Sequence, residues 1–339
     1  MATVSSKDYR EFIEEKEKEY LSPYAALSVN TRGRERPMKP CPIRTDYIRD
    51  RDRIIHCKSF RRLKHKTQVF LSPVGDHYRT RLTHTLEVSR LARTVARALA
   101  LNEDLAEAIA LGHDLGHTPF GHAGERALAK IYPGGFKHYE QSLRVVDILE
   151  RDGRGLNLCY ETRMGILHHT HGAPDDTPEA VTVRLCDRIA YVNHDLDDSI
   201  RAGILTEDEV PELIHENCGR RNSERVNSIL TDLITNSSGG VLRMSDKMQE
   251  TFDFFHAFMH SDVYTNPRAK SEESKVEGIL SRLYDYYTAH PDALPEDFSG
   301  VIEREGIERA ATDYISGMTD GYAMEKYGEL FIPFAWTVK

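Results

Sequence analysis

The chain has 339 residues, of which 40% are hydrophobic, and a formal net charge of -9. This length suits one large domain or two modest ones, and the acidic balance argues against a protein that coats nucleic acid through its overall field. No apolar run approaches the roughly 18 residues of a membrane span, the first twenty residues are too charged for a signal peptide, and the five scattered cysteines contain no CxxC pair, so we expect a soluble cytoplasmic protein with reduced cysteines and no membrane partner.

Two segments precede the first strong helical pattern. Residues 1–40 are expected to form a looser N-terminal arm, ahead of a single α-helical domain over residues 41–339. Between Arg44 and Arg81, basic residues dominate inside an otherwise acidic chain, which favours contact with an anionic ligand. Charge alone supports equally well that these side chains lie on solvated helix faces and pair with acidic residues elsewhere.

Helical periodicity then continues along most of the chain. In residues 84–100, apolar side chains such as Val88, Leu91 and Val95 recur at helical spacing without an intervening Gly or Pro, which predicts a long amphipathic helix. A second helix is expected over residues 103–112, with two acidic residues in its first turn, where the helix dipole favours them. Further helices are predicted over residues 140–150, 178–200, 207–217, 223–237, 245–260, 274–290 and 306–324. Strand-like alternation hardly appears, so the predicted fold class is all-α.

The stretch GHDLGHTPFGHAGE, residues 112–125, places three histidines beside two acidic residues. Its first pair, His113 and Asp114, offers an imidazole nitrogen and a carboxylate oxygen, which together suit Mn, Fe, Co, Ni or Zn. Candidate partners are His84, at the start of a predicted helix, and Asp187, an acid in an apolar helical stretch where an unpaired charge would be costly. Each residue alone is a weak signal, because a lone histidine near an apolar face is more often a core residue.

The order of these residues resembles the HD superfamily of metal-dependent phosphohydrolases, whose members are all-α. More narrowly, five segments in chain order resemble the bacterial deoxyguanosinetriphosphate triphosphohydrolase family: residues 51–70, 77–89, 112–125, 187–198 and 313–323. The resemblance implies an HD-domain phosphohydrolase fold, with a helical-bundle core over about residues 60–205 and additional C-terminal helices over about 206–339.

The resemblance also implies an activity and a metal site. Relatives hydrolyse a deoxynucleoside triphosphate, dGTP or another dNTP, to the deoxynucleoside and tripolyphosphate by water attack at the α-phosphorus. A divalent metal, Mn or Mg or else Fe, Co, Ni or Zn, would be bound by His84, His113, Asp114 and Asp187.

The catalytic residues are expected in and after the same stretch. His122 is the candidate for proton transfer, and Glu125, three residues later, is placed to orient it. His117 would contact phosphate. His138 would line the pocket, although a histidine in a surface loop is an equally good interpretation of that position.

Substrate contacts follow from the same resemblance. It assigns phosphate contacts to Arg81 and Arg188, the 2′ position of the sugar to Tyr191, the 3′-hydroxyl to Asp195 and Gln68, and a pocket wall near the sugar or base to Tyr314. Tyr191 and Asp195 follow Asp187 by four and eight residues, so the three share one stripe of a helix. Tyr191 could instead be a core residue and Asp195 a charge on the helix surface.

The cluster His168, His169 and His171 looks metal-like, but no carboxylate lies at a supportive spacing before Asp175. We therefore do not expect a second metal site there.

Other functions and partners stay open at this point. The protein could be another HD phosphohydrolase that acts on nucleoside monophosphates or guanosine alarmones, or a regulator that senses nucleotides or single-stranded DNA with an inactive pocket. The resemblance implies a homo-hexamer or another homo-oligomer. It also implies activation by a second dNTP or by single-stranded DNA, for which the basic stretch over residues 44–66 is a candidate.

Overall fold

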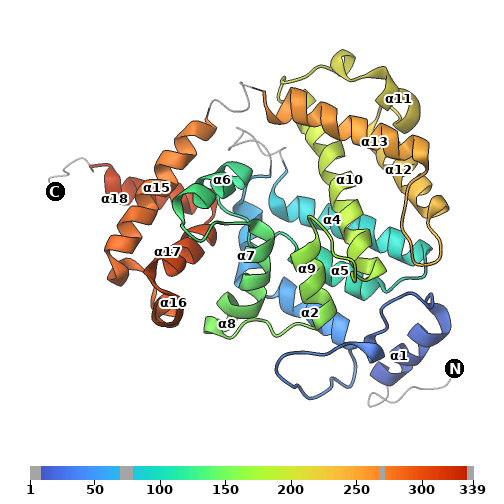
Figure 1. Ribbon diagram of the computed structural model, residues 1–339, viewed down its shortest axis with the longest axis horizontal. Coiled ribbons are helices and arrows are strands. Elements are labelled where there is room, and N and C mark those ends of the chain that lie inside the picture. The colour runs from blue at the N-terminus through green and yellow to red at the C-terminus, as the bar shows by residue number, and fades with distance from the viewer. Residues whose placement is uncertain (1–8, 69–78, 267–271, 334–339) are drawn as a thin grey trace, which may run out of the picture.

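The computed structural model describes residues 9–68, 79–266 and 272–333. Within these ranges the fold is all-α, as the sequence predicted, and the only strand-like pairings are isolated bridges (Figure 1). The helices in chain order are α1 (Tyr9–Tyr20), α2 (Asp46–Ile55), α3 (Lys58–Arg62), α4 (Arg81–Ala98), α5 (Glu103–Gly112), α6 (Gly121–Ile131), α7 (His138–Arg144), α8 (Glu150–Gly153), α9 (Tyr160–His168), α10 (Pro178–Arg201), α11 (Glu212–Cys218), α12 (Asn222–Asn236), α13 (Asp246–Phe258), α15 (Glu273–Ala289), α16 (Ser299–Glu305), α17 (Ile307–Ser316) and α18 (Asp320–Phe331).

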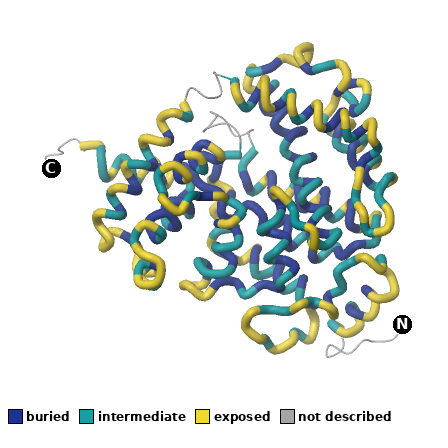
Figure 2. The backbone as a smooth tube through the Cα atoms, viewed as in Figure 1, coloured by how far each residue is buried: buried dark blue, intermediate teal, exposed yellow. Residues whose placement is uncertain are grey.

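The centre of the fold is α5, which packs against α2, α4, α9 and α10. Its sequence after the first turn is almost entirely apolar, and every residue from Leu105 onward except Glu107 is buried, as expected for a helix surrounded by others. The side chain of Asn102 caps its N-terminus by accepting from the backbone N–H of Leu105. Figure 2 shows the buried backbone concentrated where these helices meet.

Two other core helices, α4 and α10, begin at side-chain caps. Thr80 caps α4 by accepting from the backbone N–H of Thr83, so this helix starts three residues before the predicted boundary. Thr177 caps α10, and Pro178 occupies its first position, where a missing N–H costs nothing. These caps fix the ends of the two helices that carry His84 and Asp187.

The C-terminal helices form a second hydrophobic cluster. α15 packs on α6 and α17, and buried side chains such as Leu128, Leu280 and Ile315 meet there. In Figure 1 these helices lie on the opposite side of the molecule from α11, α12 and α13, which cover α10. The stretch over residues 112–125 connects α5 in the core to α6 at this second cluster.

The described part of the expected N-terminal arm, residues 9–40, is held on the body by buried carboxylates. Glu179 of α10 accepts from the backbone N–H of Ala26 at 3.0 Å, and Glu161 of α9 accepts from the backbone N–H of Arg32 at 2.8 Å. Arg34 forms a buried ion pair with Asp50 of α2, a carboxylate that also accepts from the backbone of Cys159. Residues 1–8 of the arm lie outside the described residues.

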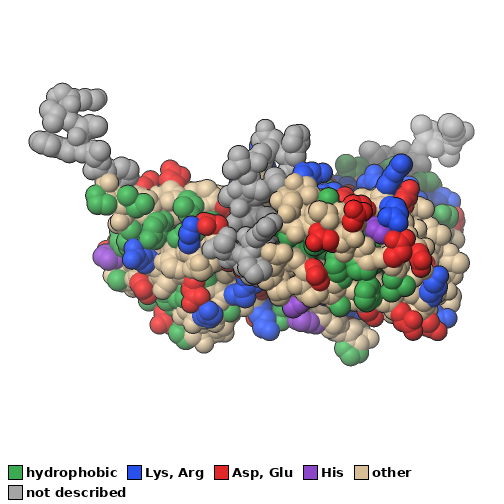
Figure 3. Space-filling view, turned by 90° about the horizontal axis from the view of Figure 1, so that it is seen from above, with side chains coloured by type: hydrophobic (Ala, Val, Ile, Leu, Met, Phe, Trp, Pro, Cys, Tyr) green, Lys and Arg blue, Asp and Glu red, His purple; other side chains and the backbone are tan. Residues whose placement is uncertain are grey.

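Surface charge and hydropathy agree with the composition. In the view of Figure 3, the Lys and Arg side chains of the described residues are interspersed with Asp and Glu rather than gathered by sign. None of the described helices has both the length and the apolar character needed to cross a membrane.

Candidate active site

A cavity of about 710 Å³ lies among α4, α6, α9, α10 and the π-helical turn η5 (Met259–Tyr264) that extends α13. Most of the site residues predicted from the sequence line it: Gln68, Arg81, His84, Asp114, His117, His122, His138, Asp187, Arg188, Tyr191 and Asp195. The fold thus brings together side chains that are more than 100 positions apart in the sequence. His113 and Glu125 do not line the cavity but contact residues that do.

The two histidines and two acids of the predicted metal site converge from α4, α10 and the end of α5. His113 Nδ1 donates to the carbonyl of Ala110 at 2.6 Å, so its lone pair is on Nε2. That nitrogen is buried without a hydrogen-bond partner and lies 3.7 Å from Asp114 Oδ1 and 3.7 Å from Asp187 Oδ1. His84 Nε2 lies 3.0 Å from the same oxygen of Asp187. A buried imidazole lone pair between two carboxylates fits a divalent cation.

The electrostatics keep Asp114, Asp187 and His84 in the form that binds metal. Burial would raise the pKa of the Asp187 carboxyl, but the hydrogen bond from His84 and the neighbouring imidazoles lower it below its ordinary value. Burial opposes ionisation of Asp114 as well, yet the Arg81 guanidinium, 2.8 Å away, holds its pKa well below the usual range. Burial lowers the pKa of His84. Ionised carboxylates and neutral imidazoles are the protonation states that metal binding requires.

A second group of imidazoles lies next to this cluster, around Glu125. Its Oε2 is 3.3 Å from His122 Nδ1, which is the predicted pair. Its Oε1 accepts from both the backbone N–H and Nδ1 of His138, at 2.8 and 2.9 Å, which the sequence did not predict. Burial would raise the pKa of Glu125, but these two histidines lower it far below its ordinary value. Glu125 therefore orients two histidines as an ionised carboxylate.

The turn that carries these groups depends on glycine and on two buried charged side chains. A Cβ at Gly116 would lie 2.1 Å from the backbone nitrogen of Ser142, so only glycine permits this approach. Lys66 donates to the carbonyls of His117 and Ser316, and burial lowers its pKa to about 7. Asp320 accepts from the backbone N–H of Phe120 at 2.9 Å. Through Ser316 and Asp320, the C-terminal helices α17 and α18 thereby stabilise the turn.

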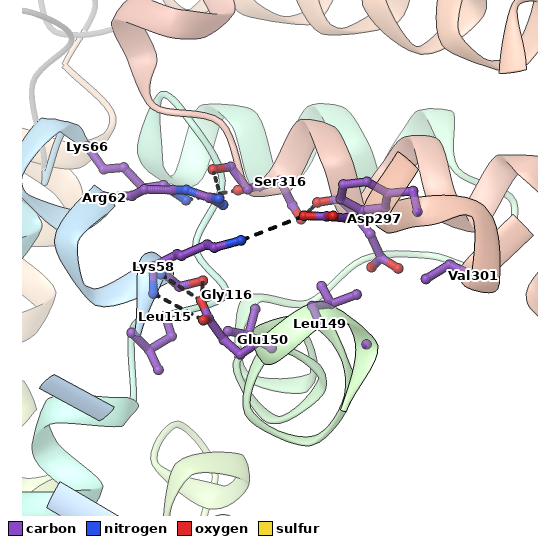
Figure 4. A pocket seen from close by; sticks show the side chains of 16 residues that line it. Lys58, Arg62, Lys66, Leu115, Gly116, Leu149, Glu150, Asp297, Val301 and Ser316 are labelled. Atoms are coloured by element: carbon purple, nitrogen blue, oxygen red, sulfur yellow. Dashed lines mark hydrogen bonds and ion pairs between the residues drawn. The ribbon is translucent and has the colours of Figure 1, made fainter. Parts of the chain in front are cut away.

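A second, smaller cavity lies behind the same turn (Figure 4). Lys58 extends across it toward Asp297, 3.7 Å away, and Glu150 accepts from the backbone N–H groups of Lys58 and Ser59. Elsewhere in the basic segment, Arg51 pairs with Asp104 and Glu107. Two interpretations of the basic segment were left open. For these residues the second one holds, because their side chains pair with acidic neighbours. Residues 69–78 of the segment lie outside the described residues.

The far side of the cavity is formed by α10 and η5. Tyr191 and Asp195 both face it, on one stripe with Asp187. The hydroxyl of Tyr191 meets His256 Nε2 at 2.5 Å, and the hydroxyl of Tyr264 donates to Asp195 Oδ2 at 2.6 Å. Two hydrogen bonds therefore tie α10 to α13 and η5 on this side of the cavity.

The chain matches two family models, an HD domain over residues 81–192 and a phosphohydrolase-associated domain over residues 242–329. A deoxyguanosinetriphosphate triphosphohydrolase-like protein of Caldanaerobacter subterraneus subsp. tengcongensis is 52% identical over 328 residues, which cover 96% of this chain and 97% of the relative. Proteins of the same description from Desulfatibacillum aliphaticivorans and Clostridium perfringens are 48% and 47% identical, each over 96% of this chain and 98% of the relative. The chain belongs to the deoxyguanosinetriphosphate triphosphohydrolase-like family.

Membership in this family confirms the predicted HD-domain fold and makes the protein an HD phosphohydrolase. A solved structure of a hypothetical protein from Aquifex aeolicus is also similar, with a TM-score of 0.48 and 19% identity, covering 84% of this chain and 68% of that chain. The His and Asp cluster in the HD domain is consistent with a metal site.

One predicted residue of this HD phosphohydrolase does not reach the cavity. Tyr314 was expected to form a pocket wall near the sugar or base, but it does not line the cavity. α17 directs it toward α15 and α18, where its ring packs 5.0 Å from Tyr287 and its hydroxyl meets that of Tyr322 at 2.9 Å. The structure thus places Tyr314 in the C-terminal hydrophobic cluster and not at the cavity.

Several cavity residues were missed from the sequence. His256, His260 and Tyr264 recur every four residues, which places them on one helical face, and that spacing was a usable signal. His169 and His171 also line the cavity. No sequence signal separated them from their neighbour His168, whose Nδ1 lies 2.6 Å from Asp176 Oδ1.

His194 was not singled out from the sequence either. Its raised pKa makes the folding stability of the protein depend on pH. Burial would lower its pKa, but Asp195 at 3.1 Å and Glu87 at 2.9 Å raise it to about 9 from 6.5. A raised pKa contributes stability that is fully present below about pH 6.5 and is lost as the pH rises through about 9. At about pH 6 we expect the wild type to have a larger free energy of unfolding than His194→Gln. By about pH 9.5 this difference should have shrunk by on the order of 3 kcal/mol. Urea unfolding at both pH values measures it, and an unchanged difference would contradict the assignment.

Proposed function

We propose that this protein hydrolyses deoxynucleoside triphosphates, dGTP among them, to the deoxynucleoside and tripolyphosphate. The observation that carries the proposal is that one cavity joins the candidate metal cluster, the imidazoles around Glu125 and the Tyr191–Asp195 stripe of α10. The names of the relatives support the same substrate class. A cavity of about 710 Å³ is in the range of small-molecule sites and has room for a nucleotide.

The candidate metal ligands are His84, His113, Asp114 and Asp187. A divalent ion bound to them would supply polarisation of the α-phosphate. Arg81 and Arg188 neutralise charge on the triphosphate, and His117 donates to a phosphate oxygen.

Proton transfer is the task of His122. Its Nδ1 faces the Glu125 carboxylate, which leaves Nε2 to accept the proton of the attacking water. The water oxygen bonds to the α-phosphorus as the bond from phosphorus to the 5′-oxygen breaks, and the 5′-oxygen leaves with a proton from an acid in the cavity. The ionised Glu125 stabilises the imidazolium that forms on His122.

Tyr191 and Asp195 select the sugar. The Tyr191 ring crowds the 2′ position and Asp195, with Gln68, binds the 3′-hydroxyl. Tyr191→Ala is expected to reduce discrimination between dGTP and GTP by about tenfold or more, the scale of one removed steric contact, measured as the ratio of kcat/KM values. Tyr191→Phe keeps the ring and is the matched control, which should preserve the discrimination. Unchanged rejection of GTP by Tyr191→Ala would refute the role.

Product analysis tests the proposed function directly. Incubation of the protein with dGTP and Mn²⁺, followed by removal of the metal with a chelator and chromatographic separation of the nucleoside and the phosphates, should show tripolyphosphate and deoxyguanosine in equal amounts. Orthophosphate or pyrophosphate as the only phosphorus product would overturn the proposal. Parallel assays with dGMP and guanosine alarmones test the other HD phosphohydrolase activities, and the four dNTPs singly and in mixtures test substrate range and activation by a second dNTP. Homo-oligomer formation and binding of single-stranded DNA stay predictions.

A further inference from the structure

Two ion pairs, one helical turn apart, join α6 to α15, and one of them lines the large cavity while the other lies outside it. On α6, His122, Arg126 and Lys130 follow one another at intervals of four residues, so they share one face of the helix. Arg126 pairs with Glu273 of α15, and Lys130 pairs with Glu277 at 2.7 Å, where the two helices pack against each other (Figure 1). Arg126 and Glu273 line the cavity, whereas Lys130 and Glu277 do not. The rim of the cavity therefore runs between the two pairs.

Arg126 lies on the side of the cavity where the proposed phosphate contacts are. It follows His122 by one turn of α6, and the ring of His122 lies 5.1 Å from that of His117. The residues proposed to meet the sugar, Tyr191 and Asp195, lie on α10 instead. A cation beside these two histidines is therefore placed for the anionic part of a nucleotide and not for its sugar.

The partner that Arg126 now has is one that it can give up. The side chains of Arg126 and Glu273 are 52% and 20% exposed, and an ion pair that water reaches contributes little net free energy. The planar guanidinium binds phosphate through the same fork of donors with which it binds a carboxylate. Arg81, by contrast, is buried and held 2.8 Å from Asp114. Arg126 is therefore the more available guanidinium for a phosphate group that enters the cavity.

We propose that Arg126 binds the triphosphate of the substrate and exchanges Glu273 for it. This inference rests on the proposed function for the identity of the substrate. In the free protein Glu273 holds the guanidinium at the rim of the cavity, and with the triphosphate bound the guanidinium donates to phosphate oxygens instead. Because tripolyphosphate is the proposed product, Arg126 also binds the product. The pair of Lys130 and Glu277 stays closed and continues to join α6 to α15.

Equilibrium binding of tripolyphosphate, without nucleotide, tests Arg126 separately from catalysis. Titration calorimetry of the full chain is carried out with Mg²⁺ in excess over tripolyphosphate. We expect Arg126→Gln to weaken binding by about tenfold, the scale of one charge-assisted hydrogen bond. Lys130→Gln removes a cation one turn away on the same face, and as the matched control it should change the affinity by less than about twofold, because salt screens exposed charges. Deoxyguanosine, which has no phosphate, should bind equally to the wild type and to Arg126→Gln.

The exchange itself is tested at Glu273. Glu273→Gln removes the competing carboxylate, so tripolyphosphate should bind about two- to fivefold more tightly, the scale of one exposed ion pair. The same substitution made in Arg126→Gln should have little effect, because the guanidinium for which the two anions compete is gone. Glu277→Gln is the matched control and should leave the affinity unchanged. An equal gain from Glu273→Gln with and without Arg126 would show that Glu273 repels phosphate on its own, and would overturn the exchange.

The remaining outcomes separate this inference from the proposed function. Unchanged affinity for tripolyphosphate in Arg126→Gln, or an equal loss in Lys130→Gln, would contradict the role of Arg126. If Arg126→Gln does not fold, as judged by circular dichroism, Glu273→Gln alone decides, since the absence of a gain would refute the exchange. Affinity for tripolyphosphate that depends on Arg126, in a protein that leaves dGTP intact, would uphold the site and reject the proposed function. Turnover of dGTP to tripolyphosphate with the same KM in Arg126→Gln would do the reverse.

Discussion

Replacing Asp187 by alanine is expected to remove the divalent metal and the turnover of dGTP together. Asp187 Oδ1 lies 3.0 Å from His84 Nε2 and 3.7 Å from His113 Nε2, so its loss leaves two imidazoles without the charge that balances a cation. Charge stabilisation by a metal is worth several kcal/mol. At about 1.4 kcal/mol per factor of ten, kcat/KM should therefore fall by about a thousandfold or more. Metal analysis and a dGTP assay on the same sample measure both effects.

The same helix provides the control for this substitution. Asp197 follows ten residues later on α10 and pairs with Arg225 at 2.7 Å, and it does not line the cavity. Asp197→Ala should keep the metal and most of the activity, because it removes an acid from α10 without touching the cluster. An Asp187→Ala protein that retains metal and turnover would show that the cation, if one acts, is bound elsewhere.

Replacing His122 by alanine should lower kcat by about 10²–10⁴ while the metal content stays unchanged. The side chain of His122 is 65% exposed, so its truncation leaves the core and the metal cluster in place. The loss reflects the missing proton acceptor opposite Glu125. Steady-state kinetics with dGTP and metal analysis of the same protein distinguish this outcome from that of Asp187→Ala.

Glu125→Gln complements that variant. It keeps the shape of the side chain but removes the charge that orients both His122 and His138, so its effect on kcat should be at least as large. Circular dichroism controls for folding, since this carboxylate also caps the backbone at His138. A fully active His122→Ala protein would overturn the proton-transfer assignment, whatever Glu125→Gln does.

Helix positions were largely predictable because apolar periodicity records which face is buried. The expected helices at 103–112 and 178–200 correspond to α5 (Glu103–Gly112) and α10 (Pro178–Arg201). The single helix expected over 306–324 is instead two, α17 and α18, with a break after Ser316. The break reads SGMTD, where Gly317 follows α17 and Thr319 caps α18 by accepting from the backbone N–H of Tyr322, so these two residues were signals that periodicity alone does not use.

The residues of the candidate site were likewise only partly predictable from the sequence. His84, His113, Asp114 and Asp187 could be identified because their order along the chain is itself a pattern, and the fold brings them together. The contact between His138 and His169 could not, because it depends on how α7 and α9 pack. Sequence spacing shows which residues share one face of a helix. Contacts between side chains at the ends of two different helices depend on the tertiary structure.

The buried ammonium group of Lys66 has a consequence for how the chain can be divided. One of its carbonyl partners, His117, belongs to the segment that matches the HD domain, and the other, Ser316, belongs to the phosphohydrolase-associated segment. A protein cut between the two segments would keep the lysine and lose half of its acceptors, at a cost of about 1–3 kcal/mol for each unsatisfied buried donor. The turn over residues 112–125 would also lose Asp320, which accepts from the backbone N–H of Phe120. We therefore expect the two family segments to fold together.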